Sequence, residues 1–323
     1  MVLHTSGCPR AFDHMNQIVL WSFVIVGLFV WLVIRPFATA PWKILGLVMV
    51  LVAVQPLTVA ALRASNQAHP LKYDYVLQSL DQTLGLTAFQ VAQRFTDLEL
   101  RTLVVIYELL SAAMIAWYGI HLVIRGGEPR KLLYSYLITF TVGGFLYGLV
   151  PAMGPRYAFG AAFPMGHPNV APVLARLDGY PNAMPSLHVA TALLLVLFSG
   201  RKRWLLSIAV LFLAGTVAAT LALEHYVVDL VVAVPFACFA VEMAYGRVIG
   251  ATKYMGLVFL WLGLIRYASP ELLHHPWGLR FLAVFSVALG VRSVAVQWKG
   301  PRKEIDVEIE SPLARALPEG RSI

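Results

Sequence analysis

The chain has 323 residues, of which 59% are apolar and only 13% are charged, whereas soluble domains carry about 25% charged residues. This composition excludes an ordinary soluble domain and indicates a polytopic membrane protein, and the two cysteines exclude a disulfide framework or a cysteine-rich zinc site. The formal net charge of +8 is spread over short loops and not gathered into one basic stripe, so we expect it to reflect membrane topology and expect no nucleic-acid partner.

Apolar runs recur along the chain, and a membrane-spanning helix needs about 20 mainly apolar residues. No small-residue cleavage site follows the first run, so we expect a span there and not a signal peptide. The fifth and eighth runs are short for a full crossing, and the eighth is the weakest candidate. We therefore predict an all-α polytopic membrane helical bundle of about eight or nine transmembrane helices, with candidate spans at 18–34, 44–62, 102–124, 132–150, 187–200, 204–223, 226–245, 254–267 and 281–297.

Two long segments interrupt these runs. Residues 64–100 are polar, and we expect a loop there with an amphipathic segment at 84–99, whereas the second loop, 151–186, is rich in Pro and Gly. The expected organisation is an N-terminal membrane segment with two spans and an outer loop at 1–100, a catalytic helical core at 101–250, C-terminal spans at 251–297 and a disordered cytoplasmic tail at 298–323.

The distribution of Lys and Arg predicts the orientation in the cell membrane. If there are nine spans, the short loops dense in Lys and Arg all fall on one side, which the positive-inside rule makes cytoplasmic together with the C-terminus. His188 and His225 then lie on the same, extracytoplasmic side. The basic residues of the cytoplasmic loops are Arg35, Lys43, Arg125, Arg130, Lys131, Arg201, Lys202, Arg203, Arg247 and Lys253.

The stretch LALEHYVVDLVVAVPFA, residues 221–237, begins one of these spans with a histidine and an aspartate. His225 and Asp229 are four residues apart, so a helix would place them on one face. The carboxylate could then accept a hydrogen bond from one imidazole nitrogen and leave the other as a base or nucleophile. The structural alternative is a His–Asp pair that only closes a helix end.

The stretch YPNAMPSLHVATALLLVLF, residues 180–198, places polar residues where an apolar helix begins. Ser186 is a good candidate for the N-cap, and a helix N-terminus favours anions. His188 would lie in the first turn, where it suits a general acid for a leaving oxygen. Tyr180 and Asn182 are candidates to line the same site.

The stretch LVPAMGPRYAFG, residues 149–160, adds a cation on the same outer side. The guanidinium of Arg156 matches phosphate oxygens in a fork, although a snorkelling juxtamembrane arginine is the alternative. Together with His188, His225 and Asp229, it fits phosphoryl transfer through a phosphohistidine. These loops contain no DxD or DxxD pair for Mg²⁺, so we expect no metal and no cofactor.

PSLH before an apolar helix, followed by HYVVD at the start of another, resembles the second and third motifs of the type 2 phosphatidic acid phosphatase superfamily. The PSLH form, with Leu187 where PSGH is typical, is similar to the branch of inositol phosphorylceramide and sphingomyelin synthases. The resemblance covers about residues 130–245 and implies a six-helix phosphatase-like core. It also implies His225 as nucleophile, Asp229 as its orienting partner and His188 as general acid.

The sequence departs from the phosphatase pattern in two places. Ala218 and Ala219 stand where that branch has Ser-Arg before the nucleophilic histidine, and the first motif with its Lys and Arg-Pro is absent. Gly154-Pro155-Arg156-Tyr157 lies near its place, so we expect Arg156 and Tyr157, with Ser186, to bind the phosphate. The site would then have fewer cationic phosphate ligands than the phosphatase branch, which favours transfer between lipid-linked phosphates over hydrolysis of a phosphomonoester.

The predicted function is therefore an integral-membrane lipid phosphotransferase that acts on a phospholipid or lipid-linked phosphate in the bilayer. A lipid phosphate phosphatase is the alternative within the same chemistry. A transporter or flippase, or a catalytically silent relative that binds a lipid headgroup, would also have many spans with a few polar groups. The sequence does not predict the donor, the acceptor or the oligomeric state.

Overall fold

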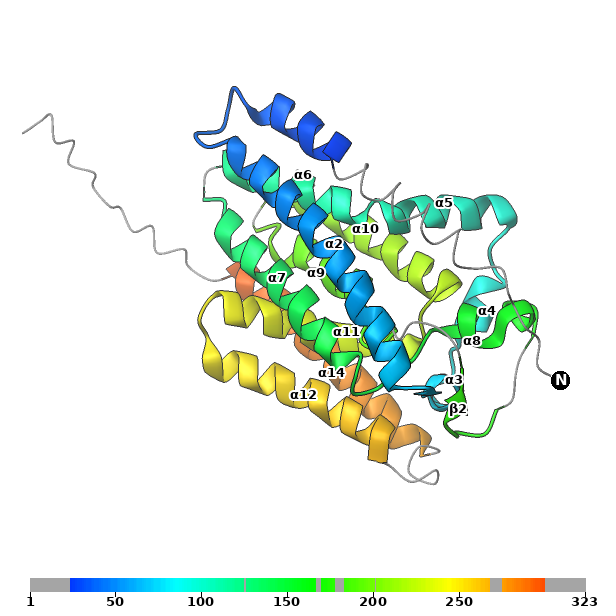
Figure 1. Ribbon diagram of the computed structural model, residues 1–323. Helices are drawn as coiled ribbons and strands as arrows, with labels where there is room; N and C mark the ends of the chain where they lie inside the picture. Colours follow the sequence, from blue (N-terminus) through cyan, green and yellow to red (C-terminus); the bar gives the residue numbers. More distant parts are fainter. Residues whose placement is uncertain are drawn as a thin grey trace, which may run out of the picture.

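The computed structural model describes residues 24–124, 126–166, 170–177, 183–200, 202–267 and 275–299. Within these ranges the protein is a bundle of α-helices with one small sheet of two strands (Figure 1). This arrangement confirms the predicted all-α polytopic bundle. The tail at 298–323 lies almost wholly outside the described residues, and so does the start of the first predicted span.

The centre of the bundle is α11 (Val227–Ala244), a helix that is apolar and buried along most of its length. It packs against α7 (Pro129–Leu146), α9 (Leu187–Leu197), α12 (Val248–Tyr267) and α14 (Pro276–Lys299). A helix that is hydrophobic on all sides is stable only when other helices or lipid surround it. The composition of α11 is therefore compatible with its central position.

The remaining long helices cover this core. A helix at Val24–Ile34 and α2 (Trp42–Ala68) correspond to the first two predicted spans, and α10 (Arg203–Leu223) corresponds to the sixth. The third predicted span is two helices, α5 (Asp97–Glu108) and α6 (Leu110–Val123), with a bend of 46° between them.

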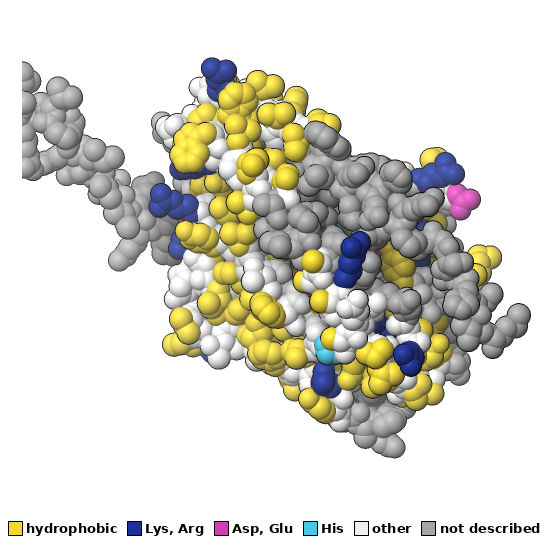
Figure 2. All heavy atoms as spheres, in the orientation of Figure 1, with side chains coloured by type: hydrophobic (Ala, Val, Ile, Leu, Met, Phe, Trp, Pro, Cys, Tyr) yellow, Lys and Arg dark blue, Asp and Glu magenta, His cyan; other side chains and the backbone are white. Residues whose placement is uncertain are grey.

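By length and apolar composition, four of the described helices could cross a membrane: α10, α11, α12 and most of α14. The bent pair α5 and α6 would make five, and three shorter apolar helices accompany them, at Val24–Ile34, Trp42–Val52 and Leu187–Leu197. Figure 2 shows hydrophobic side chains over much of the visible face, with Lys and Arg mainly towards its two ends. Such a surface fits a multi-pass membrane protein, and the predicted total of eight or nine spans stays a prediction.

The eighth predicted span was the weakest candidate, yet α12 is a continuous helix of 20 residues. Its first turns contain Lys253, directly before the predicted span, and this charge made the apolar run look shorter than the helix. The fifth predicted span remains short in the structure, because α9 has only 11 residues.

The segment 64–100, predicted to be a loop with an amphipathic part at 84–99, is mostly helical. After α2 it forms strand β1 (Leu71–Lys72), α3 (Asp74–Leu84) and α4 (Ala88–Ala92), and then α5 begins. Capping boxes start α4 at Thr87 and α5 at Thr96. The polar residues of α3 made the segment read as a loop, but several of them are buried, and the carboxylates of Asp74 and Asp81 accept hydrogen bonds inside the protein.

These short elements gather at one end of the bundle, on the right in Figure 1. Strand β1 pairs antiparallel with β2 (Ala175–Arg176), which joins the two long connecting segments. The short helix α8 (Pro155–Phe159) and the 3₁₀ turn η1 (Gly160–Ala162) lie at the same end. This end also contains the starts of α9 and α11, where the predicted site residues lie.

Candidate active site

His225 lies in the short turn between α10 and α11, and its side chain is buried. Its Nδ1 is 3.0 Å from the carbonyl oxygen of Ala183 and 3.4 Å from Oδ2 of Asp229. A carbonyl oxygen can only accept, so Nδ1 carries the proton and donates it to Ala183. The other ring nitrogen, Nε2, is then unprotonated and available as a nucleophile.

The protonation of His225 follows from its surroundings. Burial lowers the pKa of His225 to about 4, because removing water disfavours the charged ring. The carboxylate of Glu224 and the hydrogen bond to Ala183 raise the pKa but do not outweigh burial. The imidazole is therefore neutral at physiological pH.

Asp229 lies in the first turn of α11 and is fully buried. Its Oδ2 accepts the backbone N–H of Tyr226 at 2.9 Å, in addition to its approach to the histidine. Its Oδ1 has no hydrogen-bond partner within the described residues. The carboxylate thus closes the start of the helix and at the same time lies beside His225, so the structural interpretation of this pair is seen and its chemical role stays a prediction.

His188 lies in the first turn of α9, and its ring centroid is 6.0 Å from that of His225. Its ring stacks on Tyr107 of α5 with the centroids 3.8 Å apart and the planes 24° from parallel. The two histidines that the sequence placed on one side of the membrane are therefore neighbours at the same end of the bundle.

The predicted N-cap at Ser186 is confirmed. Its side chain accepts the backbone N–H of Val189 at 3.4 Å, and its own N–H donates to the backbone carbonyl of Asp229 at 3.3 Å. The latter bond fixes the start of α9 against the start of α11. The serine hydroxyl is fully buried, and its predicted contact with a phosphate stays a prediction.

Leu187 is buried and packs against α7. A Cβ placed on Gly143 would lie 2.3 Å from a methyl carbon of Leu187, so this side chain fills the space that the glycine leaves on α7. The leucine in PSLH thus takes part in the packing of α9 on α7, and its link to a transferase branch stays a prediction.

Arg156 lies in α8, where its side chain is exposed, and it forms no ion pair with any described residue. The loop before it is held close to the histidine turn, because a Cβ on Gly154 would lie 1.8 Å from the carbonyl oxygen of Glu224. Tyr157 donates a hydrogen bond to Oε1 of Glu224 at 2.8 Å. Both predicted phosphate-binding residues of this loop are therefore near the turn that carries His225.

The predicted site residues Tyr180 and Asn182 lie outside the described residues. Within the described ranges, no group of three or more His, Cys, Asp or Glu side chains is arranged to hold a metal ion.

The sequence matches the family described as PAP2 superfamily over residues 75–243, just over half of the chain. The protein belongs to the PAP2 superfamily. No curated protein and no solved structure gives a significant match. Membership makes it a phosphatase-type membrane enzyme for lipid phosphates, while the branch near the inositol phosphorylceramide synthases stays a prediction.

The PAP2 match starts in α3, well before the stretch of the histidine motifs. It therefore includes Asp81, which the sequence analysis did not single out. Both oxygens of this buried carboxylate are used, accepting the backbone N–H groups of Val227 at 2.8 Å and Val228 at 3.0 Å. Asp81 thus caps the N-terminus of α11 by accepting two of its free backbone N–H groups.

Asp74 was also missed, and it ties three segments together. It accepts the backbone N–H groups of Met153 and Gly154 and the hydroxyl of Tyr226 at distances of 2.9 to 3.1 Å. Burial raises the pKa of Asp74 to about 6, against the opposing effect of these hydrogen bonds. Asp74 and Asp81 are seven residues apart, two helical turns, and this spacing was the available sequence signal.

A third group is Glu224, directly before the histidine, where the spacing on a helix predicts a side chain that points away from His225. Its two oxygens accept the hydroxyls of Tyr107 and Tyr157, each at 2.8 Å. Since Tyr107 stacks on His188, this carboxylate connects the two histidines through a tyrosine. The site is therefore a polar network in which Glu224 is partly buried and Asp74, Asp81 and Asp229 are fully buried.

Proposed function

We propose that this PAP2 protein transfers the phosphate group of a phospholipid or lipid-linked phosphate to an acceptor through a phosphohistidine on Nε2 of His225. The observation that carries the proposal is the hydrogen bond from Nδ1 to Ala183, with Asp229 beside it. It fixes the tautomer whose free nitrogen can attack phosphorus.

In the first step, Nε2 of His225 attacks phosphorus, the P–N bond forms, and the bond from phosphorus to the leaving oxygen breaks. His188 gives its proton to that oxygen, and the negative charge of the bound phosphate favours the protonated form of this histidine. Asp229 stabilises the positive charge of the phosphorylated imidazolium. Arg156 binds the phosphate oxygens from the neighbouring loop.

In the second step, His188 removes a proton from the acceptor hydroxyl, which attacks phosphorus as the P–N bond breaks. An alcohol as acceptor gives transfer, and water gives hydrolysis. We infer transfer as the main reaction because Ala218 and Ala219 replace the cationic pattern of the phosphatase branch. Hydrolysis is the alternative outcome of the same intermediate.

We further propose that the histidines face the extracytoplasmic side and that the C-terminus is cytoplasmic. This orientation rests on the basic residues near the opposite end of the bundle, such as Arg130, Lys202 and Arg247, and on the positive-inside rule.

The test is a rapid acid- and alkali-quench of purified protein with a phospholipid labelled in its phosphate. We expect an alkali-stable, acid-labile label on the wild-type protein, with release to added alcohols exceeding release to water. His225→Ala should lose the label and at least about 10³-fold of the turnover. His275→Ala, an exposed histidine just before α14, is the matched control and should behave as wild type. Undiminished turnover in His225→Ala would exclude the mechanism.

A further inference from the structure

A pocket lies at the end of the bundle opposite the histidines, where α6 joins α7 and where α2 begins. Its volume is about 460 Å³, which is within the range of small-ligand sites. Since α7 has 18 residues, its length of about 27 Å separates this pocket from the histidine end. The residues that line the pocket are Lys43, Tyr118, Gly127, Glu128, Pro129, Arg130 and Lys131.

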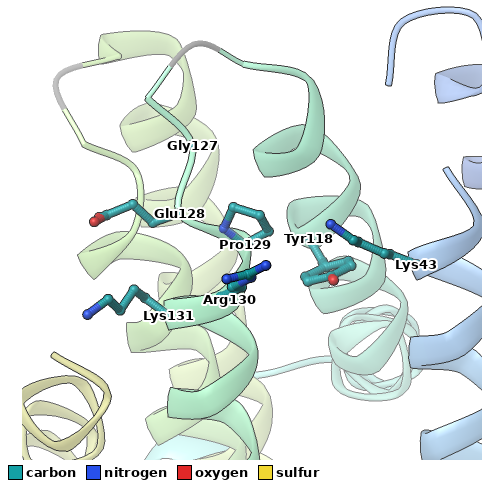
Figure 3. A pocket seen from close by; sticks show the side chains of 7 residues that line it. All are labelled: Lys43, Tyr118, Gly127, Glu128, Pro129, Arg130 and Lys131. Carbon is teal, nitrogen blue, oxygen red and sulfur yellow. The ribbon is translucent and has the colours of Figure 1, made fainter. Parts of the chain in front are cut away.

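Two cations reach into this pocket from different helices. In Figure 3 the nitrogen of Lys43, on α2, and the guanidinium of Arg130, on α7, point toward one another, with Tyr118 beside them. Neither side chain forms an ion pair or hydrogen bond with a described residue. Two like charges that converge without an acid between them repel each other, and a bound anion would remove that repulsion.

The acid that could have neutralised them is turned away. In Figure 3, Glu128 and Lys131 both point away from Lys43 and Arg130. Glu128 accepts a hydrogen bond from the hydroxyl of Tyr245, and the ammonium of Lys131 lies 4.7 Å from the centroid of the same ring. Tyr245 thus holds both side chains, and the pocket keeps the charge of Lys43 and Arg130.

We propose that this pocket binds a phosphate-bearing anion, held by Lys43 and Arg130. The guanidinium matches two phosphate oxygens and the ammonium supplies a second positive charge. The first turn of α7 has no side-chain cap, so its dipole adds to the attraction. A basic pocket between helices at the charged end of a membrane bundle fits the headgroup of an anionic phospholipid, and free phosphate carries the same chemistry.

The experiment uses the full chain in nanodiscs and follows thermal unfolding. One arm compares discs of phosphatidylcholine alone with discs that also contain phosphatidylglycerol, and a second arm adds inorganic phosphate to the phosphatidylcholine discs. The variants are the double substitution Lys43→Gln/Arg130→Gln and the charge-matched control Lys202→Gln/Arg203→Gln, which removes two exposed cations outside the pocket.

We expect the wild type and the control to gain roughly 2 °C or more in Tm with the bound anion, and the Lys43→Gln/Arg130→Gln protein to gain nothing. A gain with phosphatidylglycerol alone identifies a lipid headgroup, and a gain with inorganic phosphate identifies a soluble ligand. If neither addition shifts the wild type, or if the double variant keeps the full shift, the proposal is wrong. Turnover at His225 does not enter this readout, so the result is independent of the proposed function.

Discussion

The carbonyl oxygen of Ala183 sets the tautomer of His225, because it accepts a hydrogen bond from Nδ1 and so requires the proton on that nitrogen. The backbone N–H of Ala183 donates in turn to the carbonyl of Ala152 at 3.0 Å, so the loop before α8 supports the acceptor. The tautomer of the proposed nucleophile therefore depends on backbone geometry as well as on Asp229.

The ionisation of His225 gives a pH prediction. With a pKa near 4, the ring of the free enzyme is neutral above about pH 5 and becomes protonated and inactive only below that. With a phosphodiester substrate, which does not titrate in this range, we expect the acid limb of kcat/KM to lie below pH 5. Glu224→Gln removes a charge that raises this pKa, so the limb should move to lower pH. An acid limb near pH 6.5 that Glu224→Gln leaves in place would contradict this assignment.

Gly154 gives a prediction about stability. Its φ of +94° disfavours any other residue, and a Cβ would also overlap the carbonyl oxygen of Glu224. Gly160 provides the matched control, because its φ is +52° but a Cβ there meets nothing within 4 Å. We expect Gly160→Ala to cost about 1 kcal/mol and Gly154→Ala about 3 kcal/mol or more, measured by denaturant unfolding in detergent. Equal losses would show that the contact with Glu224 is unimportant.

At the level of elements, α3 acts as a brace for α11. Its two buried aspartates hold the start of α11 and the loop before α8, so three segments far apart in sequence are fixed around the histidine turn. Burial raises the pKa of Asp81 as well as that of Asp74, which shows the cost of placing these carboxyl groups inside the protein. The hydrogen bonds to backbone N–H groups offset part of that cost.

Removing this brace should weaken the fold. Asp81→Ala leaves the N–H groups of Val227 and Val228 without an acceptor, at a cost of about 2–4 kcal/mol for two unsatisfied donors. Thr83→Ala is the control on the same helix, because the hydroxyl of Thr83 only bonds back to the carbonyl of Ser79. Thermal unfolding should separate the two variants by several degrees. A wild-type Tm for Asp81→Ala would rule out this role.

The sequence predicted the apolar helices and both histidine motifs, because spans and i, i+4 pairs follow from local spacing. It did not predict α3, since polarity marks a surface loop and a buried polar helix equally well. The partners of Asp81 lie 146 and 147 residues further along the chain, so no local sequence pattern could reveal them. The same reason hid the contacts of Glu224, whose tyrosine partners come from α5 and α8.

For the molecule as a whole, the two ends of the bundle differ in chemistry. One end contains the histidines and the buried carboxylates, and the other contains the pocket with Lys43 and Arg130. An apolar surface lies between them (Figure 2). The proposed orientation in the membrane rests on this difference between the two ends.

Labelling with an impermeant maleimide tests that orientation in a Cys8→Ser background, where Cys238 is buried. Met165→Cys, at an exposed position near the histidine end, should be labelled in intact cells. Lys202→Cys, at the basic end, should be labelled only after the membrane is permeabilised. The reverse pattern would place the histidines on the cytoplasmic side.

The shortness of α9 affects how deep in the bilayer the reaction takes place. At about 1.5 Å per residue its 11 residues span about 16 Å, roughly half of a hydrocarbon core of about 30 Å. Its C-terminal end leads into the turn before Lys202 and Arg203, whose charges belong at a membrane surface. His188, at the other end, is then well below the opposite surface. For the proposed reaction, a lipid phosphate has to sink to that depth or the bilayer has to thin around the protein, so we expect turnover to depend on membrane thickness.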